Sequence, residues 1–264
     1  MEDVHDIDVL WIGARTTVNP FAVQEIAEAL ENTDKIVLLK NPVNPDLSLW
    51  IGGLERLYNA NIKKLGVIHR GFSTYEKTKY RNNPEWQIAI EMQSKFPDLP
   101  MICDPSHITG NRDMIVQVAQ QALDLNYNGL MIETHITPDT AWSDSAQQVT
   151  PDSLKSILKN LKVRKETDED FHYVSNLTKL RTQIDETDEK ILEILGKRMK
   201  IVEKVGGLKK EKNVAILQTQ RWQEILEKMQ SIGKENGLSE DFIVQLFKAV
   251  HQESIYHQGK IIND

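Results

Sequence analysis

The sequence lacks the features that mark disulfide-bonded, membrane-spanning and secreted proteins. Its 264 residues contain a single cysteine, Cys103, so no disulfide can form within the chain. Such usage is typical of a reducing cytoplasm. No apolar run approaches the roughly 20 residues of a membrane span, and the first residues show no signal-peptide pattern. The net charge of −7 argues against a nucleic acid held by bulk positive charge. We therefore expect a cytoplasmic protein that binds neither nucleic acid nor membranes.

The first part of the chain, residues 1–163, alternates between short β-rich runs and helical stretches. Apolar strands that alternate with helices predict a parallel sheet with helices outside it. A charged segment with few apolar residues follows, and we place a linker at 164–175 and a helical domain at 176–264. The expected strands are residues 8–14, 35–40, 65–70, 100–107 and 129–133, and the expected helices are 21–31, 45–60, 84–96, 112–126 and 151–161.

Charged side chains follow the expected strands, where ligand sites of parallel α/β folds gather. One charged residue at a strand end is usually a solvated cap, but charges at five ends are harder to dismiss. Three of them are cations that suit phosphate and carboxylate groups, and three others are of the types that bind divalent metals. A metal beside cations indicates a phosphorylated, carboxylated small substrate. The cations are Arg15, Lys40 and Arg70, and the potential metal ligands are His107, Glu133 and Asp144.

Cys103 is a further potential metal ligand. It lies four residues before His107 on the same expected strand, roughly 13 Å away at the rise of a strand. We therefore interpret it as a thiol of the core.

Five motifs of this region carry a family resemblance, namely Gly13-Ala14-Arg15, Lys40, His69-Arg70-Gly71, Asp104-Pro105-Ser106-His107 and Glu133 with the later Ser143-Asp144. Their order and approximate spacing resemble 3-deoxy-7-phosphoheptulonate (DAHP) synthase of type I-beta, over about residues 6–160. The resemblance implies a (β/α)8 barrel that condenses phosphoenolpyruvate with erythrose 4-phosphate on a divalent metal (Mn, Fe, Co or Zn). It also implies that Arg15, Lys40 and Arg70 bind phosphoenolpyruvate, and that His107, Glu133 and Asp144 are three of four metal ligands.

The chain departs from this family in the number of strands. A closed barrel of the family needs eight strands, and only five are expected here. The missing strands carry the family's cysteine metal ligand and its Lys-Pro-Arg motif for erythrose 4-phosphate. An open barrel leaves two unpaired edges and an exposed apolar interior, so this is a fragment of a longer protein or the barrel closes against another chain. We expect the synthase chemistry to be absent or impaired.

Residues 176–213 read as one long helix with an apolar seam of period near 3.5. Arg198 and Lys209 interrupt the seam, and a bare cation in a packed seam costs several kcal/mol unless an anion pairs with it. The seam therefore holds a buried ion pair or lines an anion pocket, although a dimerisation helix with surface cations would show a similar pattern. The seam residues are Ile184, Ile191, Leu195, Val202 and Val205.

Arg181 lies on the same helix but too far along it to share that pocket. Arg198 and Lys209 are roughly 16 Å apart along the axis and about 20° apart around it, so their long side chains can converge on one ligand. Arg181 precedes Arg198 by roughly 25 Å and points about 100° away. It could instead serve the equivalent pocket of a second chain in a symmetric dimer.

Two further helices are expected at residues 217–236 and 240–262. Ser254 and Gln258 share one face of the last helix because they are four residues apart. Ordinary surface polarity is the usual role of such side chains.

The three helices, with the six polar residues at their separations, resemble the all-helical class of chorismate mutase over nearly all of residues 176–262. The resemblance implies an interlocked homodimer that rearranges chorismate to prephenate without a cofactor, in which Arg181 enters the partner's site. It further implies that Arg181 and Arg198 bind the carboxylates and that Lys209 and Gln258 donate to the ether oxygen. Arg221 and Ser254 would support carboxylate binding.

Two positions depart from this second family, which often has acidic residues three before and one after the arginine at Arg221. Gln218 and Trp222 stand there instead. Gln218 can still bond a substrate hydroxyl, whereas Trp222 is a poorer substitute for a carboxylate acceptor. We expect weaker substrate binding rather than loss of activity.

The leading interpretation is a fusion of a partial synthase barrel and a complete, active mutase for early aromatic amino-acid synthesis. In the first alternative, the helical domain is a prephenate-binding regulatory and dimerisation module with negligible turnover. In the second it is a structural coiled-coil dimeriser, for which Arg198→Ala would leave stability unchanged or improve it.

Overall fold

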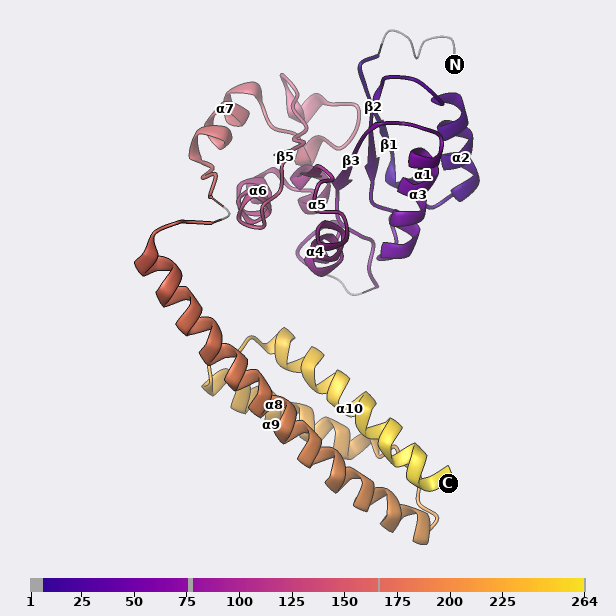
Figure 1. The fold of residues 1–264 in the computed structure, drawn as a ribbon, viewed down its shortest axis with the longest axis vertical. Coiled ribbons are helices and arrows are strands. Elements are labelled where there is room, and N and C mark those ends of the chain that lie inside the picture. Colours follow the sequence, from indigo (N-terminus) through magenta and orange to yellow (C-terminus); the bar gives the residue numbers. More distant parts are fainter. Residues whose placement is uncertain (1–6, 76–77, 166, 264) are drawn as a thin grey trace. The chain divides into compact units, whose positions relative to one another are not determined.

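A computed structural model describes residues 7–75, 78–165 and 167–263. The backbone divides into two compact units, Met1–Thr167 and Asp168–Asp264 (Figure 1). The first unit is an α/β structure and the second is entirely helical. Within the described residues, no helix combines the length and the apolar character that crossing a membrane requires.

The first unit is built on a five-stranded parallel sheet whose strands follow chain order, as the alternation of strands and helices predicts. Because every connection between neighbouring strands is parallel, all five carboxyl ends meet at one edge of the sheet. The strands are β1 (Val9–Ile12), β2 (Ile36–Lys40), β3 (Lys64–His69), β4 (Met101–Cys103) and β5 (Gly129–Leu130).

Helices that connect the strands begin at recognisable caps. The Asn19 side chain accepts hydrogen bonds from the first turn of the helix that begins at Pro20, and Thr150 caps the one that begins at Pro151. Proline suits this first position because its missing N–H would have no partner there. The helices are α1 (Ala14–Thr17), α2 (Pro20–Ala29), α3 (Leu47–Asn59), α4 (Trp86–Lys95), α5 (Pro105–Thr109), α6 (Ile115–Asp124) and α7 (Pro151–Asn160), with short 3-10 turns η2 (Arg112–Met114), η3 (Pro138–Thr140) and η4 (Ser145–Gln147).

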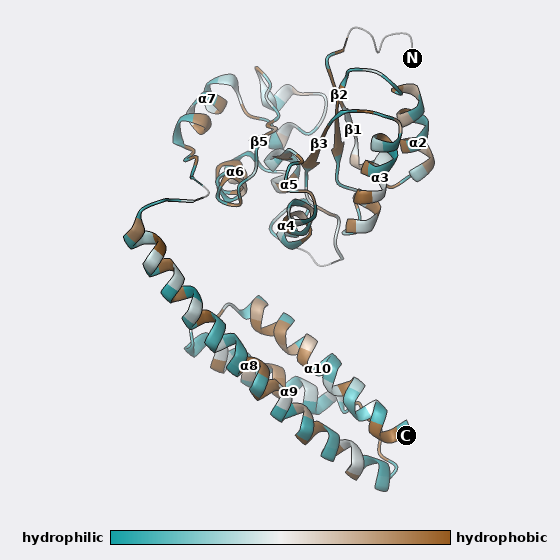
Figure 2. Cartoon of the chain, in the orientation of Figure 1, coloured by the Kyte–Doolittle hydropathy of each residue, from teal (hydrophilic) through white to brown (hydrophobic). Residues whose placement is uncertain are grey.

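Apolar side chains of the strands and the connecting helices form the core of this unit. Val37, Leu39 and Val67 are completely buried between the sheet and helices such as α3. Figure 2 shows the strands as hydrophobic segments beside helices of mixed hydropathy. Cys103 is also completely buried, and burial raises the pKa of its thiol, as expected for a thiol of the core.

The sequence-based strand at residues 100–107 is wrong in its second half. β4 ends at Cys103, and α5 begins at Pro105. Asp104 caps α5 by accepting a hydrogen bond from the His107 backbone N–H at 3.1 Å. An Asp-Pro pair is a start signal for a helix, and it outweighs the strand character of the preceding apolar run. His107 therefore lies on a short helix, so the strand-rise distance to Cys103 does not apply.

Both edges of the described sheet are open. β1 pairs with β2 alone and β5 with β4 alone. Trp11 on β1 is 59% exposed, and Val9 and Ile36 are also exposed. The open edges match the partial barrel that a count of five strands predicts.

The second unit consists of three helices, α8 (Phe171–Glu211), α9 (Thr219–Glu235) and α10 (Glu240–Asn263). α8 begins five residues before the expected position, because Asp170 caps its first turn by accepting from the Tyr173 N–H. A Cβ added at Gly206 would lie 3.3 Å from the Gln258 Cα, so a glycine permits the close packing of α8 on α10. Gly237 adopts a left-handed conformation after α9 and ends that helix.

Candidate active sites

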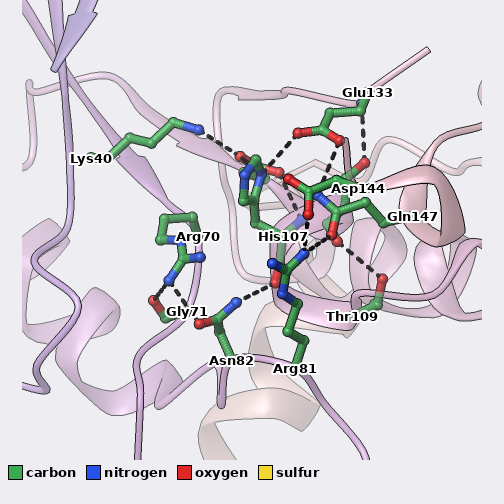
Figure 3. A network of polar contacts seen from close by, with 12 residues as sticks. Lys40, Arg70, Gly71, Arg81, Asn82, His107, Thr109, Glu133, Asp144 and Gln147 are labelled. Carbon is green, nitrogen blue, oxygen red and sulfur yellow. Dashed lines mark hydrogen bonds and ion pairs between the residues drawn. The ribbon is translucent and has the colours of Figure 1, made fainter. Parts of the chain in front are cut away.

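The three predicted metal ligands lie together at the carboxyl edge of the sheet. His107 is on α5, Glu133 follows β5, and Asp144 precedes η4. One donor atom of each lies within 4.8 Å of the others (Figure 3). An imidazole with two carboxylates is a common donor set for a transition metal.

His107 has a nitrogen that fits a cation. Its Nδ1 is buried, and the described residues give it no hydrogen bond of normal geometry. The same atom lies 2.8 Å from Asp104 Oδ2 and 3.4 Å from Glu133 Oε1. A buried nitrogen without a hydrogen bond, beside a pair of carboxylates, suits a divalent cation better than an apolar ligand.

Lys40 and Asp104 form a buried ion pair beside this cluster. The Lys40 Nζ lies 3.0 Å from Asp104 Oδ2, and Lys40 is 7% exposed. Burial favours protonation of Asp104, but His107 and Lys40 outweigh it and lower the pKa of this carboxyl group. Asp104 therefore remains an anion that fixes both Lys40 and the start of α5.

The other two predicted cations lie near the same edge. Arg70 is partly buried, and its guanidinium donates to Asn82 Oδ1 at 2.8 Å. Arg15 is exposed on α1. Burial lowers the pKa of Arg70, with smaller effects of the same sign from Arg81 and Arg15. These cations are close enough to repel one another, which makes the edge attractive to an anionic ligand.

Sequence reasoning missed several polar side chains that hold this edge together. Arg81 and Asn82 lie in the loop between β3 and α4, and Gln147 closes η4 (Figure 3). Arg81 and Asn82 follow no strand directly, so their position along the chain gave no signal. Gln147 is 1% exposed, and an isolated glutamine in a polar segment gives no hint of burial.

His69 supports the edge from below. Its Nε2 lies 2.6 Å from Pro84 O, and its Nδ1 lies 2.8 Å from the Tyr127 hydroxyl. Pro84 O can only accept, so Nε2 carries the proton and the Tyr127 hydroxyl donates to Nδ1. Burial lowers the pKa of His69 to about 4, and the ring is neutral at pH 7.

In the second unit, the predicted pocket residues of α8 and α10 meet. The Arg198 guanidinium donates to Ser254 Oγ at 2.6 Å, and Ser254 is 5% exposed. Burial lowers the pKa of Arg198. One turn later on α10, Gln258 is 9% exposed, and its Oε1 has no hydrogen-bond partner among the described residues. The contact places a cation, a hydroxyl and an unsatisfied amide together.

The remaining predicted residues are arranged less closely. Lys209 Nζ donates to the Ile216 carbonyl at 2.6 Å. Arg221 is exposed and pairs with Glu224 on its own helix at 3.0 Å. Arg181 is exposed on the first half of α8, 17 positions before Arg198.

A histidine that sequence reasoning missed packs beside this pocket. The rings of Trp222 and His251 are stacked, with centroids 4.1 Å apart. Burial lowers the pKa of His251, and the charges of Arg198 and Lys209 act in the same direction. His251 lies three residues before Ser254, so the helical spacing on α10 could have indicated it.

Two family profiles match the chain. The DAHP synthetase I family matches residues 3–169, and chorismate mutase type II matches residues 180–259. The first match corresponds to the α/β unit and the second to the three helices.

Individual relatives match the same two parts. The phospho-2-dehydro-3-deoxyheptonate aldolase of Thermotoga maritima is 28% identical over 155 residues, which are 59% of this chain and 44% of that protein. The bifunctional chorismate mutase/prephenate dehydratase of Buchnera aphidicola is 33% identical over 89 residues, 34% of this chain and 23% of that protein.

A solved structure agrees with these matches. A truncated form of 3-deoxy-D-arabino-heptulosonate 7-phosphate synthase from Thermotoga maritima has a TM-score of 0.52 and 27% identity, covering 58% of this chain and 56% of that chain. The chain spans less than half the length of the curated relatives that it matches.

Proposed function

Because the chain belongs to the DAHP synthetase I family and carries a fused chorismate mutase type II domain, we propose that it rearranges chorismate to prephenate. The fusion of these two domains implies a role in the shikimate pathway and aromatic amino-acid biosynthesis. The mutase activity is assigned to the three-helix unit, and the α/β unit is assigned a synthase site that is incomplete in this chain.

The contact between Arg198 and Ser254 carries the mutase proposal. It joins a buried cation of α8 to a buried hydroxyl of α10 at 2.6 Å, next to the unsatisfied amide oxygen of Gln258. A buried polar group without a partner costs about 1–3 kcal/mol. A ligand with carboxylate and ether oxygens could engage the cation, and a rotated Gln258 amide could donate to it.

The rearrangement suits such a pocket because it needs no base, metal or covalent intermediate. The site has to hold the compact diaxial conformer of chorismate and stabilise charge that develops on the breaking ether oxygen. In this proposal Arg198, with Arg221 and Ser254 in support, binds carboxylate. Lys209 and Gln258 donate to the ether oxygen.

A second copy of the chain completes the site in this proposal. Exposed apolar side chains run along α8, which is the pattern of a helix that packs against a partner. Arg181 lies among them and would enter the partner's pocket. These exposed residues include Leu180, Ile184, Ile191, Leu192, Ile194 and Ile201.

The test follows chorismate disappearance by ultraviolet absorbance with the full chain. Arg198→Ala should abolish turnover, because it removes the carboxylate-binding cation. The control is Lys197→Ala, since Lys197 is exposed and pairs with Glu193, and it should retain turnover. Absence of turnover in the unmodified chain would refute the mutase proposal.

A ligand-binding regulatory module is the second candidate for the helical unit. Trp222 stands where the mutase family often has an acid, and it stacks on His251 rather than offering a carboxylate. In this case prephenate would raise the unfolding temperature of the chain, and chorismate would not be consumed.

For the α/β unit we propose a divalent-metal site formed by His107, Glu133 and Asp144. When bound, the metal supplies Lewis-acid polarisation of a substrate oxygen. Lys40 and Arg70, with Arg15, would bind the phosphate and carboxylate of phosphoenolpyruvate. Condensation with erythrose 4-phosphate would need the strands and the fourth ligand that this chain does not supply.

A further inference from the structure

Arg81 contacts the candidate metal site from a loop that was given no role in it. Its guanidinium NH1 donates to Asp144 Oδ1 and to Gln147 Oε1, both at 2.7 Å (Figure 3). One nitrogen therefore bridges a predicted metal ligand and a buried glutamine. The hydrogen bond with Arg81 is the largest factor that lowers the pKa of Asp144, so this carboxylate stays ionised.

Gln147 passes the contact on to a second predicted ligand. Its Nε2 donates to Glu133 Oε2 at 3.0 Å. Both ends of the amide are used, which fixes its orientation in a position that is almost fully buried. The other oxygen of Glu133 faces the His107 ring. Arg81 and Gln147 thus each bond one oxygen of a carboxylate from outside the cluster.

The loop that carries Arg81 is itself fixed against α5. The backbone N–H groups of Arg81 and Asn82 donate to the carbonyls of Thr109 and Ile108. The Asn82 side chain donates to His107 O at 2.6 Å. Gly110 has a φ of +62°, and a Cβ there would lie 2.6 Å from the Arg81 Cβ. The close approach of the loop to α5 therefore depends on a glycine.

We propose that Arg81 and Gln147 are positioning residues of the divalent-metal site, which hold the carboxylates of Asp144 and Glu133 in a binding arrangement. This inference rests on the metal site proposed above. Groups that orient metal ligands in this way typically change metal affinity by 10–100-fold. The side chains of Arg81 and Asp144 are 47% and 33% exposed, so their ion pair contributes little to folding stability.

The experiment titrates the full chain with Mn²⁺ by calorimetry and records the visible absorption of bound Co²⁺. Arg81→Gln and Gln147→Leu should each raise the Mn²⁺ dissociation constant about tenfold or more and alter the Co²⁺ bands. Arg81→Lys should restore part of the affinity, since a lysine can pair with Asp144 but lacks the guanidinium fork. The matched control is Arg164→Gln, which removes an exposed ion pair with Asp124 and should change neither measurement.

Two results would overturn the inference, and they differ from each other. If Arg81→Gln and Gln147→Leu bind Mn²⁺ like the unmodified chain and keep its Co²⁺ spectrum, the two residues do not position the ligands. If the unmodified chain binds neither ion, the metal site itself is wrong and the positioning role falls with it. Unfolding temperatures of all variants show which of them retain the fold.

Discussion

The buried imidazole of His69 gives the first unit a specific sensitivity to acid. The pKa of His69 is lowered from 6.5 to about 4 by burial, so the unfolded chain takes up a proton at a higher pH than the folded chain. Stability from this group is complete above pH 6.5 and is lost as the pH falls toward 4. The difference corresponds to roughly 3 kcal/mol.

The prediction is tested by urea unfolding of the full chain at several pH values between 7.5 and 4. Tryptophan fluorescence reports mainly on the first unit, because four of the five tryptophans lie there. His69→Gln has no proton to gain in this range, so its free energy of unfolding should fall less steeply. Parallel curves for the two proteins would show that His69 does not titrate as its burial indicates.

At Trp222 the prediction concerns substrate binding. Trp222 is partly buried and stacked on His251, within the field of Arg198 and Lys209. Trp222→Glu places an acceptor for the substrate hydroxyl at this position, so we expect a severalfold lower Michaelis constant for chorismate. Trp222→Leu removes the ring without adding an acceptor and serves as the control. A Michaelis constant that stays unchanged in Trp222→Glu would contradict the expectation.

At the scale of single elements, the sequence predicted those whose signals are local. Apolar runs between helical stretches predicted all five strands and their parallel order. The seam spacing predicted the long helix α8. The misplaced strand end before α5 came from weighing the apolar run above the Asp104-Pro105 cap. Arg81 and Gln147 could not be found, because only the folded chain brings residues 63 and 66 positions apart from their partners.

α8 gives a prediction about how the helical unit assembles. In an interlocked dimer, Arg181 and Arg198 of one chain serve different pockets. Arg181→Ala and Arg198→Ala should each be inactive alone, yet a heterodimer of the two has one intact site. Random mixing after co-refolding should therefore restore about one quarter of the unmodified activity.

The control mixes Arg198→Ala with Lys209→Ala. These two residues are proposed to serve the pocket of their own chain, so no combination of the chains yields an intact site. Activity should stay at the level of the single variants. A mixture of the Arg181 and Arg198 variants that stays equally inactive would argue against the shared site.

At the scale of the whole molecule, the two units are proposed to bind ligands of different chemistry. Prephenate is a dicarboxylate suited to the cations of the helical unit, whereas Mn²⁺ suits the carboxylates and imidazole of the α/β unit. A ligand that binds only the folded form stabilises it by about 2.7 kcal/mol at a concentration of 100 times its dissociation constant. Each ligand should therefore raise the unfolding temperature of one unit.

Calorimetric unfolding of the full chain with each ligand in turn tests this assignment. Arg198→Ala should lose the shift caused by prephenate and keep the shift caused by Mn²⁺, and Glu133→Gln should show the reverse. The two variants serve as controls for each other, because each leaves the opposite site unchanged. Loss of both shifts in either variant, without a change in its unliganded unfolding, would show that the ligands do not act on separate sites.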